Sequence, residues 1–110
     1  MSMALIWIII GGLFEPVWVI CLKRMNEDRS IVNILLAVFF IFLSPLFLSF
    51  GMDEIGMGVA YSIWTGIGAV ATLIVGYFLY KDDLGFKKLF FAVLIITGVV
   101  GLELSAGVTI

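Results

Sequence analysis

Four long apolar stretches, separated by short polar segments, take up nearly all of this 110-residue chain. They cover about residues 4–22, 32–50, 58–80 and 86–105, and each has roughly the 20 residues that a helix needs to cross a hydrocarbon core about 30 Å thick. Hydrophobic residues make up 64% of the chain and charged residues only 13%, whereas soluble domains have roughly 25% charged residues. We therefore expect an all-α protein of the lipid bilayer, with a single four-helix transmembrane domain over residues 1–110.

The polar segments between the stretches are too short to form a soluble domain. Because backbone groups in lipid must find their hydrogen-bond partners internally, each stretch is expected to be a helix, and short loops favour an up-down-up-down antiparallel bundle. The chain has one cysteine and no histidine, so we expect no disulfide, no metal site and no cofactor. It has no basic patch of the size that nucleic acids require, and the first stretch does not resemble a removable signal peptide.

The basic residues are distributed unequally between the two ends of the expected helices. Four spans place the first and third loops on one side of the membrane, and the second loop with both termini on the other. All the basic residues fall on the first side: Lys23, Arg24, Arg29, Lys81, Lys87 and Lys88. Cytoplasmic loops carry the excess of lysine and arginine, so we expect a bacterial cytoplasmic-membrane protein with both termini outside the cytoplasm.

Glu15 is the only charged residue in the interior of the first stretch. Ionisable residues at this depth are costly and usually functional. Loss of hydration disfavours the bare carboxylate, and either a proton or a bound organic cation would neutralise it. We therefore expect a proton-coupled transporter and no enzyme, with Gly12 and Trp18 on the same helix face. Pro16 removes the N–H that would bond the carbonyl of Gly12, which predicts a kink or a free acceptor beside Glu15.

The third stretch places two aromatic residues on one helix face. Tyr61 and Trp64 offer both a polar group and a π surface that suits an organic cation, and Tyr61 is within possible reach of Glu15 for a hydrogen bond. Packing or an interfacial belt is an equally good explanation of an aromatic pair in a membrane helix. Gly66 and Gly68, on the same helix, are expected to allow a bend.

Small residues recur every four positions in the last two stretches. One ridge comprises Gly68, Thr72 and Gly76, and the other comprises Thr97, Gly101 and Ser105. Such ridges let helix backbones approach closely, either within one subunit or between two. Since four helices can hardly enclose a substrate cavity with two gates, we expect a dimer.

Two sequence segments carry a resemblance to a known family. Gly-Leu-Phe-Glu-Pro-Val-Trp at 12–18, followed by Leu22-Lys23, and Gly-Val-Ala-Tyr-Ser-Ile-Trp-Thr-Gly-Ile-Gly at 58–68 resemble the small multidrug resistance family. The resemblance extends over the whole chain in length, number of spans and order. The Trp-Thr-Gly-Ile-Gly run at 64–68 is similar to the guanidinium-exporter branch of that family.

The resemblance implies a role for each matching position. Glu15 would bind the proton and the substrate in turn, and the fourth-span ridge of small residues would form the dimer contact. The other implied binding and hinge positions are Trp18, Ser44, Tyr61, Trp64, Gly66 and Gly68. The family implies an antiparallel dimer in which two subunits of opposite orientation share one site.

An antiparallel homodimer requires one sequence to insert in both orientations. The one-sided distribution of basic residues opposes this, so we expect a heterodimer with a homologous four-span subunit of inverse charge bias. Glu103 stands where guanidinium exporters commonly have a lysine, the first loop lacks their usual Gly-Phe-[ST]-[KR] pattern, and Pro16 beside the key glutamate is also unusual.

The leading hypothesis is a subunit of an exporter of small guanidinium-type cations. Polyamines or lipophilic quaternary ammonium compounds are the alternative substrates, and the site residues would be much the same. A third hypothesis is an accessory subunit that does not transport, in which Glu15 belongs to a purely structural network.

Overall fold

The computed structural model describes residues 3–108, and that part of the chain contains helices and no strand. Four helical segments are long and apolar enough to cross a membrane, as the sequence predicts. The first of them, Ala4–Glu27, is divided into two helices. The helices are α1 (Ala4–Leu13), α2 (Glu15–Glu27), α3 (Ile31–Ile55), α4 (Met57–Tyr80) and α5 (Phe86–Ser105).

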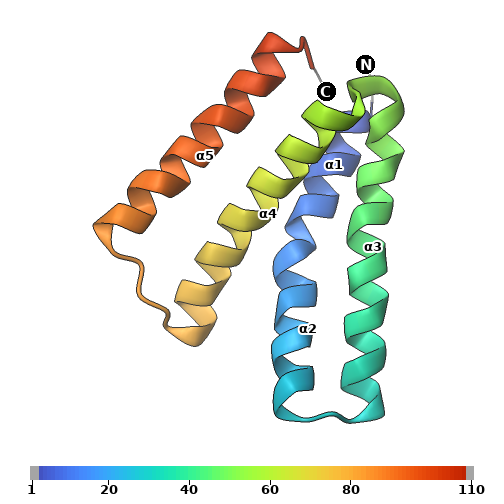
Figure 1. The fold of residues 1–110 in the computed structure, drawn as a ribbon, viewed down its shortest axis with the longest axis vertical. Helices are drawn as coiled ribbons and strands as arrows, with labels where there is room; N and C mark the ends of the chain where they lie inside the picture. The colour runs from blue at the N-terminus through green and yellow to red at the C-terminus, as the bar shows by residue number, and fades with distance from the viewer. Residues whose placement is uncertain (1–2, 109–110) are drawn as a thin grey trace.

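Short connections make successive spans run in opposite directions (Figure 1). Ser30 begins α3, and its hydroxyl accepts a hydrogen bond from the N–H of Asn33 at 3.3 Å. Gly56 alone joins α3 to α4, and its positive φ of 87° is the reason a glycine suits this turn. The α3–α4 turn lies at the same end of the molecule as the two termini. The up-down-up-down order is therefore confirmed.

The first span is interrupted at Phe14, two residues before Pro16. The N–H of Phe14 donates to the carbonyls of Ile10 and Gly11 at 3.1 and 3.2 Å, and its own carbonyl accepts from the N–H of Val17 at 3.0 Å. These bonds include three-residue steps, which tighten the turn around the proline without separating the two helices. The helix is thus interrupted near Pro16, as expected, and the interruption lies immediately before Glu15.

The four spans pack unevenly, and the last of them is set apart from the others. The first span, α3 and α4 pack together, whereas α5 contacts α4 alone among the helices of the described chain (Figure 1). The molecule is flat, with principal extents of 44 × 34 × 18 Å. Val99 is the only buried residue within α5. A single contact face leaves most of α5 to lipid or to another subunit.

The best-packed part of the subunit lies where α1, α3 and α4 meet, and Val99 of α5 joins it from the α4 side. Its buried members are Leu5, Ile8, Leu48, Ala60, Ile63 and Val99. Close approach of α1 and α3 depends on Gly51, because a Cβ there would lie 2.5 Å from Cγ1 of Ile8. This cluster fixes α1 against its neighbours, and the chain then continues through the Phe14 interruption to α2.

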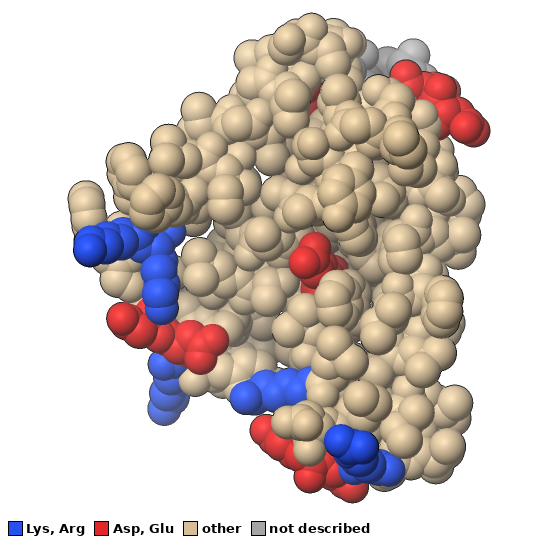
Figure 2. Space-filling view, viewed as in Figure 1, with Lys and Arg blue, Asp and Glu red and all other residues tan. Residues whose placement is uncertain are grey.

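Apart from Glu15 in the middle of the first span, the charged side chains gather at or near the ends of the helices. Figure 2 shows the lysines and arginines at the end that carries the α2–α3 and α4–α5 connections, and large tan areas between the two ends. Large apolar side chains such as Phe42, Phe78 and Phe86 are exposed on α3, α4 and α5. A wide apolar band of this kind matches a bilayer interior.

Candidate functional site

Glu15 is the first residue of α2, and its carboxylate lies directly against Gly68 of α4. A Cβ added at Gly68 would overlap the Oε2 atom of Glu15, so only glycine leaves room for this carboxylate. Oε2 is buried and has no hydrogen-bond partner among the described residues. A buried carboxylate oxygen without a partner is costly, and a proton or a cation would relieve that cost.

Ser44 joins three helices close to this carboxylate. It is fully buried, and its hydroxyl donates to the carbonyl of Gly11 at 2.7 Å. The same hydroxyl oxygen accepts a hydrogen bond from Nε1 of Trp64 at 3.2 Å. The first span, α3 and α4 are therefore tied together by one hydroxyl group, and two of the predicted site residues are in direct contact.

Tyr61 lies beside Trp64 on α4, with ring centroids 5.6 Å apart and an interplanar angle of 42°. The side chain is exposed, and it makes no hydrogen bond to Glu15 in the described structure. The hydrogen bond suggested by the sequence is therefore absent within this subunit. Trp18 is half-buried on α2, one turn from Glu15. Both rings remain candidates for binding a cation, without a direct link to the carboxylate here.

The predicted glycines are positions of close helix contact. A Cβ at Gly12 would lie 3.0 Å from the carbonyl oxygen of Trp64, and one at Gly66 would lie 2.6 Å from Cγ2 of Val99. Helix α4 is continuous through Gly66 and Gly68. In this conformation Gly66 allows close contact with α5, and Gly68 allows close contact with Glu15. A bend of α4 at these glycines stays a prediction.

The two ridges of small residues have different neighbours. On α4, Gly68 faces Glu15 and a Cβ at Gly76 would lie 2.6 Å from Oδ2 of Asp82, so this ridge is used inside the subunit. On α5, Thr97, Gly101 and Ser105 are all exposed. A Cβ at Gly101 would meet no atom within 4 Å. The second ridge is therefore exposed in the described subunit, and its role as a dimer contact stays a prediction.

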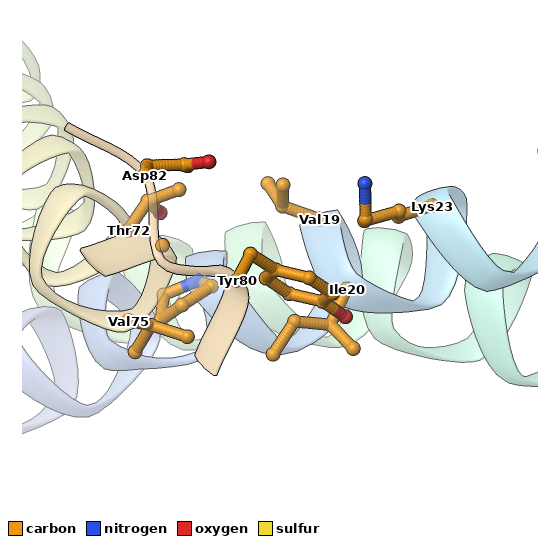
Figure 3. A pocket seen from close by; sticks show the side chains of 9 residues that line it. Val19, Ile20, Lys23, Thr72, Val75, Tyr80 and Asp82 are labelled. Carbon is orange, nitrogen blue, oxygen red and sulfur yellow. The ribbon is translucent and has the colours of Figure 1, made fainter. Parts of the chain in front are cut away.

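A cavity of about 130 Å³ lies between α2 and α4, and its lining on α2 begins at Pro16, the residue after Glu15 (Figure 3). Pro16 and Val19 line it from α2, and Thr72 and Val75 from α4. Its rim includes the exposed residues Lys23, Tyr80 and Asp82. The Nζ atom of Lys23 lies 4.8 Å from the centroid of the Tyr80 ring. Sequence reasoning did not identify this cavity, because it depends on which faces of α2 and α4 meet.

An aromatic seam between the first span and α3 was also missed. Phe14 stacks on Phe40 and Phe47 with centroid distances of 5.9 and 5.5 Å, and Trp7 stacks on Phe47 at 5.5 Å. The available signal was a seven-residue spacing on both helices, Trp7 to Phe14 and Phe40 to Phe47. These rings hold the interrupted segment in place, and Glu15 is the next residue.

Most of the sequence matches the model of a known protein family. The model of the family described as Small Multidrug Resistance protein matches residues 3–95. This match includes Glu15, the Ser44 network and all of α4.

Curated relatives extend over almost the whole chain. A guanidinium exporter of Salmonella typhimurium is 37% identical over 102 residues, which is 91% of this chain and 97% of that protein. A guanidinium exporter of Yersinia pestis is 33% identical over 104 residues, 94% of this chain and all of its own length. One from Proteus vulgaris is 33% identical over 102 residues, 91% of this chain and 98% of that protein. These relatives are named as exporters, and none of the names indicates an enzyme.

Proposed function

This chain belongs to the small multidrug resistance family, and we propose that it is one subunit of a proton-coupled antiporter for guanidinium-type cations. At the coarser level it is an integral inner-membrane protein and an exporter of small organic cations. The observation that carries the finer proposal is the buried Oε2 atom of Glu15, which has no partner among the described residues.

Competition between a proton and an organic cation for Glu15 couples proton transport to cation export. A protonated carboxyl and a carboxylate paired with an organic cation are both neutral, so either state relieves the cost of a charge in lipid. Since each ligand removes the other, binding of a cation must release a proton. Ser44 and Trp64 hold the surrounding helices in register, and the faces of Tyr61 and Trp64 suit a flat, delocalised cation.

The names of the relatives support guanidinium as the first candidate substrate. Polyamines and quaternary ammonium compounds would use the same carboxylate, so the assay must compare all three classes. Guanidinium is planar and carries several N–H donors, whereas a quaternary ammonium ion has none. A site selected for guanidinium is therefore expected to discriminate strongly between these two cations.

The direct test is proton release by the purified transporter in weakly buffered detergent solution. Addition of guanidinium is expected to release protons, while tetrapropylammonium and spermidine release fewer. Glu15→Gln should abolish the release, because a neutral amide neither yields a proton nor attracts a cation. Glu54→Gln is the matched control, since Glu54 is exposed at the end of α3. Full proton release by Glu15→Gln would disprove the proposal.

The same competition predicts how affinity depends on pH. Where Glu15 is mostly protonated, each unit rise in pH should strengthen apparent guanidinium binding by up to about tenfold, because one proton must leave for each cation bound. Equilibrium binding measured across pH values checks this prediction. An affinity independent of pH, in a protein that still requires Glu15, would contradict shared occupancy.

We further propose that the transporter is a heterodimer whose partner is a homologue of opposite orientation. An antiparallel dimer is consistent with this family. All lysines and arginines of this chain lie in or next to the first and third connections, which favours a single orientation with both termini outside the cytoplasm. The open ridge at Thr97, Gly101 and Ser105 supports a contact with that partner. Full transport by this chain expressed alone would remove the need for a partner.

A further inference from the structure

Thr72 has an unusual environment for a threonine in a membrane helix. Its Oγ1 atom is buried and has no hydrogen-bond partner among the described residues. Threonines in helices commonly donate to a carbonyl one turn earlier, as Thr97 does to the carbonyl of Val93 at 2.8 Å. The Thr72 hydroxyl does not, although it lies in a span where an unpaired polar atom is costly.

The position of Thr72 connects Glu15 to the cavity. Glu15 lies against Gly68, and Thr72 follows Gly68 by four residues on the same helix face. The four residues from Gly68 to Thr72 rise about 6 Å along α4, so Thr72 is the next polar group from Glu15 toward the basic end of the molecule. Thr72 lines the cavity, and so does Pro16, the residue after Glu15.

The cavity has the size and the outlet of a water-filled passage. A volume of about 130 Å³ can hold several waters, since one water needs roughly 10–15 Å³ of such space. Figure 3 shows Lys23 and Asp82 on opposite sides of the cavity, Lys23 on the α2 side and Asp82, from the α4–α5 connection, on the α4 side, with the Tyr80 ring between them. The charged rim gives waters an exit at the same end as the lysines and arginines.

From these observations we propose that Thr72 positions water for proton exchange between Glu15 and the basic side of the membrane. Rotation of the Thr72 side chain would turn Oγ1 into the cavity that this residue lines, and a water hydrogen-bonded to it there takes the proton from the carboxyl of Glu15, the residue before Pro16 of the cavity wall. The proton then passes to bulk water at the rim near Asp82, and the carboxylate stays behind to receive the organic cation. Thr72 acts through this water and is a positioning residue, without contact with the cation. This inference rests on the proposed proton-coupled function.

Kinetics of proton release test the role of Thr72 in the assembled transporter. Thr72→Val keeps the volume and removes the hydroxyl, and it should slow guanidinium-triggered proton release by roughly tenfold or more, with little change in equilibrium guanidinium affinity. Thr72→Ser should restore the rate, because it restores the hydroxyl. Ser49→Ala, which removes an exposed hydroxyl that bonds Leu46 of its own helix, is the control. Stopped-flow absorbance of a pH indicator measures the rates.

The outcomes separate this inference from the proposed function. A normal release rate in Thr72→Val, in a transporter that does release protons, overturns the role of Thr72 alone. Slow release with an equal loss of affinity, not rescued by Thr72→Ser, also overturns it, because that pattern indicates disturbed packing. If the unaltered transporter releases no proton at all, the proposed function fails first.

Hydration of the cavity is testable without transport. In a Cys21→Ala background, Val19→Cys should react with the charged thiol reagent 2-(trimethylammonium)ethyl methanethiosulfonate, because the thiol would face water in the cavity. Phe78→Cys, on the apolar outer surface of α4, should stay unreactive in lipid. Mass spectrometry of the reconstituted protein gives the labelled fraction. Equal, negligible labelling at both positions would show that the cavity is dry and would overturn the proposal.

Discussion

At the scale of single residues, the site depends on the absence of a side chain at Gly68. Gly68 has no side chain, and the Glu15 carboxylate occupies the space where a Cβ would lie. The carboxylate therefore faces the backbone of α4, in a position that the sequence motif alone does not reveal. The motif singled out Gly68 as a flexible residue, and its steric role follows only from the side-by-side placement of α2 and α4.

We predict that Gly68→Ala displaces the Glu15 carboxylate and weakens guanidinium binding. Added atoms in packed sites cost about 1–3 kcal/mol, which corresponds to roughly a 5- to 150-fold loss of affinity. Gly98→Ala is the control, because a Cβ there meets no atom within 4 Å. Isothermal titration of both variants with guanidinium checks the prediction. Equal guanidinium affinities would show that the carboxylate can bind the cation from a different position.

The buried hydroxyl of Ser44 has a stabilising role as well as a predicted binding role. Ser44→Ala removes the bond to the Gly11 carbonyl and leaves Nε1 of Trp64 without its acceptor. We expect a loss of roughly 0.6–2 kcal/mol in the free energy of unfolding, the range found for hydrogen bonds between membrane helices. Denaturation in mixed micelles measures it, with Ser49→Ala as the control at an exposed position of the same helix. An equal loss in the two variants would argue against a special role for the network.

At the scale of the elements, the turn between α3 and α4 is the shortest connection between two spans of the described chain. Gly56 forms it alone, with φ 87° and ψ 148°, a conformation that other residues rarely adopt. A Cβ at this position would meet no atom within 4 Å, so the requirement for glycine comes from the backbone and not from packing. The sequence predicts a polar connection between the spans at about 32–50 and 58–80. That Gly56 alone forms this connection is visible only in the structure.

A pair of alanine substitutions separates these two causes. Gly56→Ala should destabilise the protein by about 1–3 kcal/mol because it strains the backbone. Gly58→Ala, two residues later in α4 and equally unobstructed, should be neutral or stabilising by up to about 1 kcal/mol because alanine favours the helix. Thermal unfolding of the purified variants in detergent measures both. A tolerated Gly56→Ala would mean that α3 and α4 can join through another turn.

At the scale of the whole molecule, the subunit is flat and incomplete. Helix α5 packs on α4 alone, and the face that carries Thr97, Gly101 and Ser105 is open. Tyr61, which packs beside Trp64, is likewise exposed within one subunit. An open ridge and an exposed binding-site ring are both explained if a second subunit supplies the missing walls.

Membrane orientation is the property of the whole molecule that decides which partner is possible. A C-terminal alkaline phosphatase fusion should be active and a C-terminal green fluorescent protein fusion dark, because the charge bias places the C-terminus outside the cytoplasm. Moving the charge by Lys81→Asn, Lys87→Asn and Lys88→Asn together with Asp53→Lys and Glu54→Lys should produce both orientations. If the unaltered chain already gives both signals, a homodimer becomes the better explanation.

The number of spans, their alternation and the placement of every basic residue at one end could be predicted from the sequence. These properties follow from local hydropathy, because a helix in lipid satisfies its own backbone hydrogen bonds and its length must match the bilayer. Glu15 could also be singled out as a candidate, because a charged group stands out in an apolar helix, whereas Ser44 became a candidate only through the family resemblance. The binding roles of both residues stay predictions.

Only the tertiary structure decided how each helix is rotated about its axis. A soluble helix shows its buried face by its apolar stripe, but lipid is as apolar as the protein interior, so the pattern of a membrane helix does not mark the face that meets a neighbour. The contact of Glu15 with Gly68, the cavity at Thr72 and the separation of α5 from the other helices all depend on that rotation. Close contact and hydrogen bonding between helices set it, and both act between residues far apart in the sequence.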